Sequence, residues 1–296
     1  MYAPRKLTIA AVGAAAAAFA LAACGKDAAP SGGSNVSVSA AAGVTLTGSP
    51  TFDRIKSRGT VVVGVKEDQP NLGFKDPTTN TYSGFDVEMA RLVAAGLGFA
   101  PDRIEYKVIQ SAAREQAIST GDIDYYVGTY SITDKRKEKI SFAGPYFVAG
   151  QDLLVRKDDT SINGPESLAG KKVCSATGST SIQRIREKFP EAQTVEFDKY
   201  SQCVEQLIGK QVDAVTTDDA ILKGYAAQQP DKLKVVGKPF SEEKYGIGLP
   251  KDDKALRDKV NDLLTAAESG GQWKQIYDAT LGKSGSPAQP PAIDRY

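Results

Sequence analysis

The stretch Thr60-Val61-Val62-Val63-Gly64-Val65 is a short, apolar, β-branched run of the kind found in buried parallel strands. Downstream, apolar residues recur at helical spacing over 84–96, with a glycine at either end. The same signals predict a second strand over 103–109, a helix over 113–119 and a third strand over 123–127. Strands that alternate with helices in this way form parallel sheets, so this half of the chain predicts a βαβαβ unit.

A second unit of the same kind follows Asn163-Gly164-Pro165. Its strands and helices alternate over 172–175, 180–189, 194–197, 200–208, 212–216, 219–228 and 233–236. A strand over 245–249 and a long amphipathic helix over 253–268 are left at the end. The chain therefore predicts two similar α/β lobes, each a mainly parallel sheet flanked by helices. They are either independent domains in tandem or, if the last strand and helix return to the first lobe, two lobes joined by two hinge crossings.

The charge composition excludes several classes of function. Among 296 residues, 37 Lys and Arg nearly cancel 36 Asp and Glu, and no basic block indicates nucleic acid as a partner. The chain has no His, the commonest metal ligand and the commonest general base. Hydrolase triads built on His are therefore excluded, whereas catalysis through Glu, Asp, Lys or Tyr stays open. We expect no cofactor and no metal site.

The N-terminus has the features of an export signal. Arg5 and Lys6 precede an apolar run over 7–23 that is too short and too Ala-rich to predict a spanning helix. The run ends in the letters LAACG at 21–25, which resemble a bacterial lipoprotein signal with residues 1–23 removed and a diacylglycerol on Cys24. Two acyl chains on one Cys suffice for stable anchoring at the outer face of the cell membrane. The alternative is an ordinary secretory signal followed by an incidental Cys.

Two flanking segments carry few structural signals. Residues 24–50 are rich in small residues and poor in charges, which is typical of a flexible tether. Residues 283–296 include Pro287, Pro290 and Pro291 and predict a loose tail. We therefore expect the folded body within 51–282.

Two cysteines remain in the body, Cys174 and Cys203. In an exported protein we expect such a pair to be bonded, and a single pair without His is too few for a zinc site. The bond would stabilise the protein by about 3–4 kcal/mol in the chain-entropy model. The alternative is two separate buried thiols.

Several motifs taken together resemble the polar amino acid-binding proteins of ABC importers. They read GTYSITDKR at 128–136, ISFAGPYF at 140–147, GFDVE at 84–88, LAGKKV at 168–173, TGSTS at 177–181 and YGIGLPK at 245–251. Within this family (family 3 of the solute-binding proteins), the cysteine pair and the letters KEDQP at 66–70 are most similar to the glutamate-binding lipoproteins of actinobacteria. The resemblance covers 51–282, which is essentially the whole expected body.

This resemblance implies a type II periplasmic-binding-protein clamp that closes over one ligand at the hinge. Lobe 1 would comprise 51–148 and 244–282, and lobe 2 would comprise 149–243. The implied function is a monomeric, non-enzymatic binder that passes glutamate or a similar acidic amino acid to the permease of an ABC importer with its ATPase. Because unpaired buried ions cost several kcal/mol each, the site must offer a cation to each ligand carboxylate and a carboxylate to its ammonium.

By the same resemblance, Arg136 binds the α-carboxylate, to which a guanidinium can make two parallel hydrogen bonds. Asp218, at the end of a predicted strand, receives the α-ammonium together with the Ser131 hydroxyl and the Thr129 carbonyl. Thr180 opens a helix whose free N–H groups suit a carboxylate. The alternatives are a surface charge for Arg136 and a plain N-cap role for the turn at Thr180.

Selectivity for an acidic side chain would come from Arg114, preceded by Ser111, and from Lys66. Acid-selective members of the family carry an Arg at the position of Arg114 and a second cation at that of Lys66. This chain departs from the pattern in having Lys rather than Arg there, which leaves glutamate and aspartate both open. Either side chain, taken alone, is equally typical of an exposed charge.

Two other functions stay open. The first alternative is a binder of glutamine, asparagine or another polar amino acid. The second is a clamp-fold enzyme acting on a small amino-acid-like substrate. For an enzyme, the acids near the expected site are Glu67 and Glu88. A sensory module is disfavoured because the sequence predicts neither a spanning helix nor a signalling domain.

Overall fold

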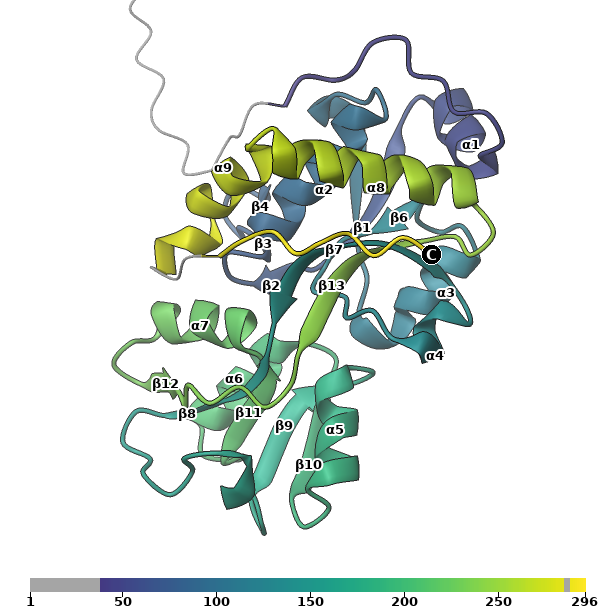
Figure 1. Ribbon diagram of the computed structural model, residues 1–296. Helices are drawn as coiled ribbons and strands as arrows, with labels where there is room; N and C mark the ends of the chain where they lie inside the picture. Colours follow the sequence, from purple (N-terminus) through teal and green to yellow (C-terminus); the bar gives the residue numbers. More distant parts are fainter. Residues whose placement is uncertain (1–37, 285–287) are drawn as a thin grey trace, which may run out of the picture. The chain divides into compact units, whose positions relative to one another are not determined.

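The computed structural model, drawn in Figure 1, describes residues 38–284 and 288–296. The expected signal peptide and Cys24 lie outside these residues, so the export signal and the lipid anchor stay predictions. Within the described ranges, no helix combines the length and the apolar character that crossing a membrane requires.

Lobe 1 is built on a five-stranded sheet in the order β5-β1-β6-β13-β7. Its strands are β1 (Val61–Val65), β5 (Ile104–Val108), β6 (Tyr125–Tyr126), β7 (Ser141–Ala149) and β13 (Glu243–Leu249). Its helices are α1 (Pro50–Arg58), α2 (Phe85–Gly96), α3 (Arg114–Ser119), α4 (Asp134–Lys137), α8 (Lys254–Ser269) and α9 (Gln272–Ala279), with short turns η1 (Pro101–Arg103), η2 (Ser111–Ala113) and η4 (Leu281–Ser284). Strand β13 and the helices after it thus return to lobe 1, as the hinge interpretation requires (Figure 1).

Lobe 2 repeats this plan with the order β10-β9-β11-β8-β12. Its strands are β8 (Gln151–Arg156), β9 (Lys172–Ala176), β10 (Gln193–Phe197), β11 (Ala214–Asp218) and β12 (Leu233–Val235). Its helices are α5 (Thr180–Lys188), α6 (Tyr200–Ile208) and α7 (Asp219–Gln228), with a short turn η3 (Pro165–Ser167). A separate three-stranded sheet, β2 (Asp68–Gln69), β3 (Gly73–Lys75) and β4 (Tyr82–Ser83), follows β1.

Both five-stranded sheets are mixed rather than mainly parallel. In each, three strands pair in parallel, β5-β1-β6 and β10-β9-β11, as the alternating pattern predicts. The other pairs, which involve β7, β8, β12 and β13, are antiparallel. Each antiparallel pair contains β8 or β13, the two strands that enter their lobes directly across the hinge. No crossover helix precedes either strand, and parallel pairing with the preceding strand needs one.

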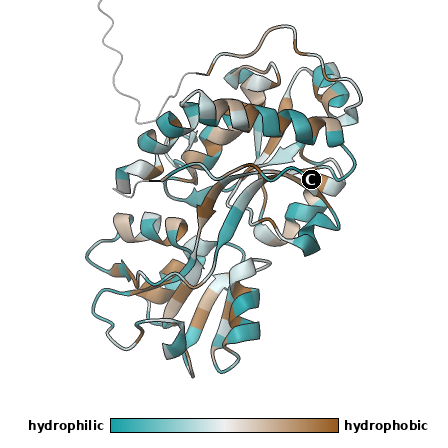
Figure 2. Ribbon diagram, viewed as in Figure 1, coloured by the Kyte–Doolittle hydropathy of each residue, from teal (hydrophilic) through white to brown (hydrophobic). Residues whose placement is uncertain are grey.

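Apolar burial explains why the strands lie where they do. Val61, Val63 and Val65 of β1 are fully buried, and burying a Val side chain contributes about 1.5–3 kcal/mol. Figure 2 shows hydrophobic strands inside and hydrophilic outer faces on the covering helices. An aromatic cluster joins α2 to α9, where the Phe85 ring meets the edge-on Trp273 ring at 5.7 Å.

The two hinge crossings lie against each other. The backbone N–H of Phe240 donates to the Gln151 carbonyl at 2.9 Å, and the Gln151 N–H donates to the Ser241 hydroxyl at 3.0 Å. A Cβ added to Gly150 would stand 2.7 Å from Pro239 and 2.8 Å from the Ser241 carbonyl oxygen. Glycine at 150 therefore permits the close approach of the crossings.

The expected disulfide is confirmed. Cys174 of β9 and Cys203 of α6 are bonded, with their Cα atoms 5.6 Å apart. The bond joins the central strand of lobe 2 to a helix that covers it.

The segment before α1 is packed where a tether was expected. Val44 and Leu46 contact the main core, and the Ala41 N–H donates to the Ala95 carbonyl at 2.8 Å. The Ser49 hydroxyl caps α1 and donates to Asp253 at 2.8 Å. The tether expected over 24–50 is therefore wrong for its described part, 38–50, because small residues without periodicity can still pack against a lobe.

The C-terminal segment is likewise packed where a loose tail was expected. It runs across lobe 1 in Figure 1, and the Asp294 N–H donates to the Gly144 carbonyl at 2.9 Å. The Tyr296 hydroxyl accepts from the Phe142 N–H at 2.8 Å, and Arg295 pairs with Asp262 at 2.8 Å. Over residues 288–296 the expectation is wrong, because the prolines leave the segment extended and still able to bond a neighbouring strand. We call residues 288–296 the C-terminal strap.

Candidate functional site

The expected site residues lie around one small cavity at the contact between the lobes. Among the described residues, its lining combines lobe 1 and lobe 2 side chains: Ser111, Arg114, Thr129, Ser131, Arg136, Ser179, Thr180, Ser181, Tyr200 and Asp218. Seven of the eight ligand-binding residues expected from the sequence are in this set. The eighth, Lys66, donates from its Nζ to the Ser111 hydroxyl at 2.9 Å.

Arg136 is buried and fully engaged. Its position follows from a cap, since the Thr133 hydroxyl at the start of α4 accepts from the Arg136 N–H at 3.2 Å. Its guanidinium donates to the Ser131 carbonyl at 2.7 Å and, across the lobes, to the Gly178 carbonyl at 3.1 Å. Its Nε lies 3.2 Å from a Glu115 carboxylate oxygen. All three nitrogens of the guanidinium thus have a partner within the protein.

Arg114, at the start of α3, lies beside Arg136. Its Nε donates to the Ser111 carbonyl at 3.0 Å, and its guanidinium carbon stands 4.1 Å from the centre of the Tyr130 ring. The guanidinium carbon of Arg136 stands 4.8 Å from the centre of the same ring, so one aromatic side chain contacts both cations. Burial, and then the charge of Arg114, lower the pKa of Arg136 to about 10.

Lys66 follows β1 and is 2% exposed. Burial, and then the nearby Arg114, lower the pKa of its ammonium to about 7. Among the described residues, neither Lys66 nor Arg114 has a carboxylate within ion-pair distance. Two buried cations thus stand near the cavity without an acidic partner.

Asp218 ends β11 at the carboxyl end of the strand and occupies the N-cap position of α7, where its side chain makes no capping hydrogen bond. One carboxylate oxygen accepts from the Tyr245 hydroxyl at 2.6 Å, and the other, Oδ1, is buried without a partner in the described part of the chain. Burial, and then the charge of Glu243, raise the pKa of Asp218 to about 7. The next residue, Asp219, instead pairs with Lys223 at 2.6 Å.

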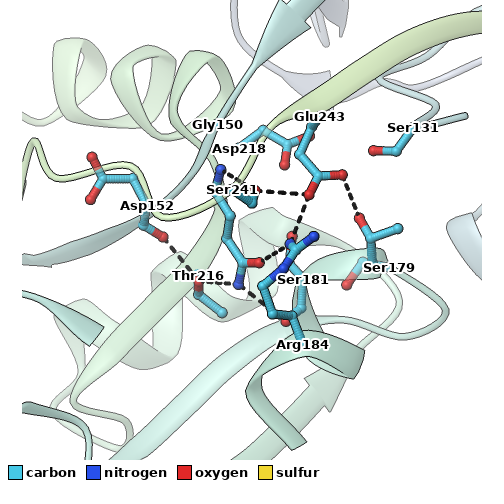
Figure 3. Close-up of polar contacts among 12 residues, drawn as sticks. Ser131, Gly150, Asp152, Ser179, Ser181, Arg184, Thr216, Asp218, Ser241 and Glu243 are labelled. Atoms are coloured by element: carbon cyan, nitrogen blue, oxygen red, sulfur yellow. Dashed lines mark hydrogen bonds and ion pairs between the residues drawn. The ribbon is translucent and has the colours of Figure 1, made fainter. Parts of the chain in front are cut away.

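The turn before α5 supplies the lobe 2 wall. Ser179 caps the helix by accepting from the Ile182 N–H at 3.1 Å. The Thr180 hydroxyl donates to Glu243 at 3.1 Å, in the cluster drawn in Figure 3. Gly178 has a φ of 76°, and a Cβ added there would stand 2.7 Å from the Ala112 Cα of lobe 1. Glycine at 178 therefore allows the two lobes to touch.

Thr129 and Ser131 belong to the loop after β6. Thr129 has a φ of 44°, a strained value for a non-glycine residue, and its N–H donates to a carboxylate oxygen of Asp86 at 2.9 Å. The Tyr146 hydroxyl donates to the other oxygen at 2.7 Å. Burial raises the pKa of Asp86 to about 6 against these two hydrogen bonds. Asp86 therefore holds the loop in place.

Sequence reasoning missed the acids that organise the site. Glu115 follows Arg114 directly, and its proximity to a basic residue was the only signal. Glu243 acts through tertiary contacts that no local pattern encodes. Asp86 lies in the motif at 84–88, which marked the residue without indicating its contact with Thr129. The two acids considered for an enzyme do not line the cavity: Glu67 pairs with Lys199 at 2.5 Å, and Glu88 pairs with Arg91 at 2.5 Å.

The space at the site is divided. The inner cavity has a volume of about 10 Å³, about enough for one water. A larger cavity of about 330 Å³ adjoins it and shares Ser111, Arg136 and Thr180. The lobes are therefore closed on each other, and an amino acid needs the inner space to widen. No group of three or more potential metal ligands occurs in the described residues.

Comparisons with known proteins agree with this architecture. The chain is 39% identical over 264 residues to the glutamate-binding protein GluB of Corynebacterium efficiens, with 84% of this chain and 90% of that protein covered. It is 39% identical over 228 residues to the glutamine-binding protein GlnH of Bacillus subtilis, with 77% and 83% covered. The structure of an ancestral arginine-binding protein bound to arginine superposes with a TM-score of 0.71, at 36% identity, over 76% of this chain and 99% of that one.

The relatives with known structures share the two-lobed clamp, which confirms the type II periplasmic-binding-protein fold. The model of one family, the bacterial extracellular solute-binding proteins, family 3, matches residues 61–283. This match spans both lobes and both hinge crossings, and the chain therefore belongs to that family.

Proposed function

We propose that this amino-acid-binding protein captures glutamate, with aspartate as the next candidate, by lobe closure and delivers it to the permease of an ABC importer. Membership of a family of solute-binding proteins supports binding rather than catalysis. The identity of the ligand, the permease partner, the monomeric state and an anchor at Cys24 all belong to the proposal.

The observation that carries the proposal is the unpartnered Oδ1 of Asp218. A buried acceptor without a hydrogen bond costs about 1–3 kcal/mol, and more when it is charged. An α-ammonium placed at this oxygen would satisfy it. Ser131 and Thr129 line the same cavity, and the hydroxyl of Ser131 and the carbonyl of Thr129 would take the remaining ammonium protons.

The charges around the cavity favour a ligand of net charge −1. Arg136, Arg114 and Lys66 contribute three positive charges when protonated, and Asp218 and Glu115 contribute two negative ones. The remaining charge of +1 matches glutamate or aspartate, each of which has two carboxylates and one ammonium. A neutral amino acid would leave this charge of +1 buried without a counter-charge, which is unfavourable.

The residues then divide the ligand between them. Arg136 would bind the α-carboxylate, replacing its present contact with the Gly178 carbonyl, and the N–H groups at Thr180 would donate from lobe 2. Arg114 and Lys66, which both donate to Ser111, would bind the side-chain carboxylate. Because lobe 1 and lobe 2 both contribute, the ligand would stabilise the closed form.

Isothermal titration calorimetry with glutamate, aspartate, glutamine and asparagine tests the proposal. We expect glutamate to bind most tightly and Arg114→Ala to weaken it by about 30- to 100-fold while glutamine changes little. Arg103→Ala is the matched control, because it removes a guanidinium that is 61% exposed on the same lobe. A clear signal for glutamine with none for glutamate would refute the ligand assignment.

One observation favours a neutral polar amino acid as the second candidate. Burial, and then Arg114, lower the pKa of Lys66 to about 7, so part of the population carries a neutral amine at neutral pH. A neutral amine can accept a hydrogen bond from a ligand amide, which an ammonium cannot. The same titrations decide between the two, because a glutamine binder would tolerate Lys66→Met better than a glutamate binder.

A further inference from the structure

Glu243 is a buried acid at the point where the second hinge crossing enters β13. It is 3% exposed, and its two carboxylate oxygens reach separate partners (Figure 3). Oε1 lies 2.7 Å from the Arg184 guanidinium and accepts from the Ser241 hydroxyl at 2.9 Å. Oε2 accepts from the Thr180 hydroxyl at 3.1 Å. One hinge residue thus holds both the first and the fifth residue of α5.

The other hinge crossing reaches the same helix. Gln151, the first residue of β8, accepts from Arg184 at 2.6 Å and donates to the Ser181 carbonyl at 3.1 Å. Its amide also donates to the Thr216 hydroxyl of β11 at 2.9 Å, within the cluster of Figure 3. Arg184 therefore lies between the two crossings, paired with Glu243 from one and Gln151 from the other.

We propose that Glu243 is a positioning residue of the binding site, which fixes the start of α5 against both hinge crossings through Arg184 and Thr180. This inference rests on the proposed function, because the start of α5 is the lobe 2 wall that receives the ligand. A change in hinge angle moves the crossings, and the bonds at Glu243 make the ligand-binding turn move with them. Glu243 itself does not line the cavity and needs no contact with the ligand.

Glu243 also acts on Asp218. Burial favours the protonated forms of both acids, but the Ser131 hydroxyl, Arg184 and Ser241 outweigh it at Glu243 and lower its pKa. The ionised Glu243 then repels the charged form of Asp218. The other groups that act on Asp218 are Tyr245 and Arg184, which lower its pKa, and Asp219, which raises it.

The test compares Glu243→Gln with Glu242→Gln. Glu242 is the adjacent residue, and its side chain is 66% exposed, so the control makes the same charge change in solvent. Calorimetry with glutamate at pH 8 should show about tenfold weaker binding for Glu243→Gln and no more than about a twofold change for Glu242→Gln. Equal affinities for the two variants would overturn the proposal.

The pH profile separates positioning from a loss of packing. In the wild type, Asp218 must lose its proton to bind an ammonium, so affinity falls below pH 7. In Glu243→Gln the repulsion is gone and Asp218 stays ionised to lower pH. The ratio of wild-type affinity to variant affinity should therefore shrink from about tenfold at pH 8 to about twofold at pH 6. A ratio independent of pH would mean that Glu243 is only structural.

Two further measurements keep the inference independent of folding defects and of the ligand. The double variant Glu243→Gln, Arg184→Gln removes the cation left unpaired, and it should recover the melting temperature without recovering affinity; recovery of both would count against positioning.

Carbon-13 NMR titration of Asp218 in ligand-free protein should show a lower midpoint in Glu243→Gln than in Glu242→Gln. An unchanged midpoint refutes the inference even if glutamate proves not to be the ligand, whereas absent glutamate binding by the wild type refutes only the proposed function.

Discussion

The two lobes use the same strand plan but present opposite chemistry to the cavity. On the cavity wall, lobe 1 carries Arg114 and Arg136, whereas lobe 2 carries Asp218 and the start of α5. Behind the wall, Lys66 of lobe 1 bonds Ser111, and Glu243 of the second crossing bonds Thr180. In both lobes the groups on the wall stand at the end of a strand or at the start of the next helix, the region where open α/β sheets bind ligands. The comparison teaches that the shared scaffold fixes where a ligand lies, and the loops fix which ligand it is.

The largest effect is expected from Asp218→Asn, which removes the negative charge of the lobe 2 wall and keeps the size of the side chain. We expect glutamate affinity to fall by about a thousandfold, about 4 kcal/mol, because the α-ammonium loses its only facing carboxylate in the described site. Calorimetry at pH 8 measures the loss. Asp219→Asn is the matched control, since Asp219 pairs with Lys223 outside the cavity, and comparable losses in the two variants would contradict the role given to Asp218.

The lobes also differ in how they are held together, because lobe 2 has the disulfide between β9 and α6. The double variant Cys174→Ala, Cys203→Ala should lower the free energy of unfolding by about 3–4 kcal/mol, as the chain-entropy model gives for a closed loop of this size. Urea denaturation measures the change. Glutamate affinity should fall much less than stability, since neither cysteine lines the cavity; a large loss of affinity with little loss of stability would show that the bond serves the site instead.

Lobe 1 has no disulfide among its described residues, and the C-terminal strap lies across it. The Tyr296 ring has the Lys137 ammonium and the Arg257 guanidinium each 4.3 Å from its centre. Tyr296→Ala should reduce stability by about 1–2 kcal/mol through loss of these contacts and of the acceptor for the Phe142 N–H. Tyr296→Phe, which keeps the ring, should lose about half as much in the same urea experiment. Identical stability of all three proteins would show that the strap contributes nothing.

The repeated strand–helix units could be predicted from the sequence because their apolar periodicity is local. The expected strand over 60–65 is β1, and the expected helix over 84–96 is α2. The hinge strands β7 and β8 were missed. β7 contains Gly144 and Pro145, which are rare in strand interiors, and β8 opens with two polar residues, Gln151 and Asp152, that become buried only in the folded lobe 2.

The candidate site could be predicted only where a motif marks it. The motif over 128–136 placed Thr129, Ser131 and Arg136, and the structure brings them together with Asp218 from 82 positions beyond Arg136. Glu115 and Glu243 lie in none of the motifs and act through partners distant in sequence: Glu243, for instance, contacts Arg184 59 residues away. Asp86 lies in the motif at 84–88, but that motif does not indicate its bond to the Thr129 N–H 43 residues away. Tertiary structure alone assembles these pairs.

The smallest expected effect, and the most direct test of the contrast between the lobes, is the pH profile of glutamate binding. Burial lowers the pKa of Lys66 from 10.5 to about 7, so rising pH through 7 removes the lobe 1 charge that the side-chain carboxylate needs. Burial raises the pKa of Asp218 from 3.8 to about 7, so falling pH through 7 removes the lobe 2 charge that the ammonium needs. Affinity should therefore peak near pH 7 and fall about threefold, about 0.7 kcal/mol, by pH 6 and by pH 8. Calorimetry over pH 5–9 measures the curve, with Lys66→Met losing the alkaline limb alone. If the affinity of the wild type were constant between pH 6 and pH 8, neither Lys66 nor Asp218 would change its charge near pH 7, and the prediction would be wrong.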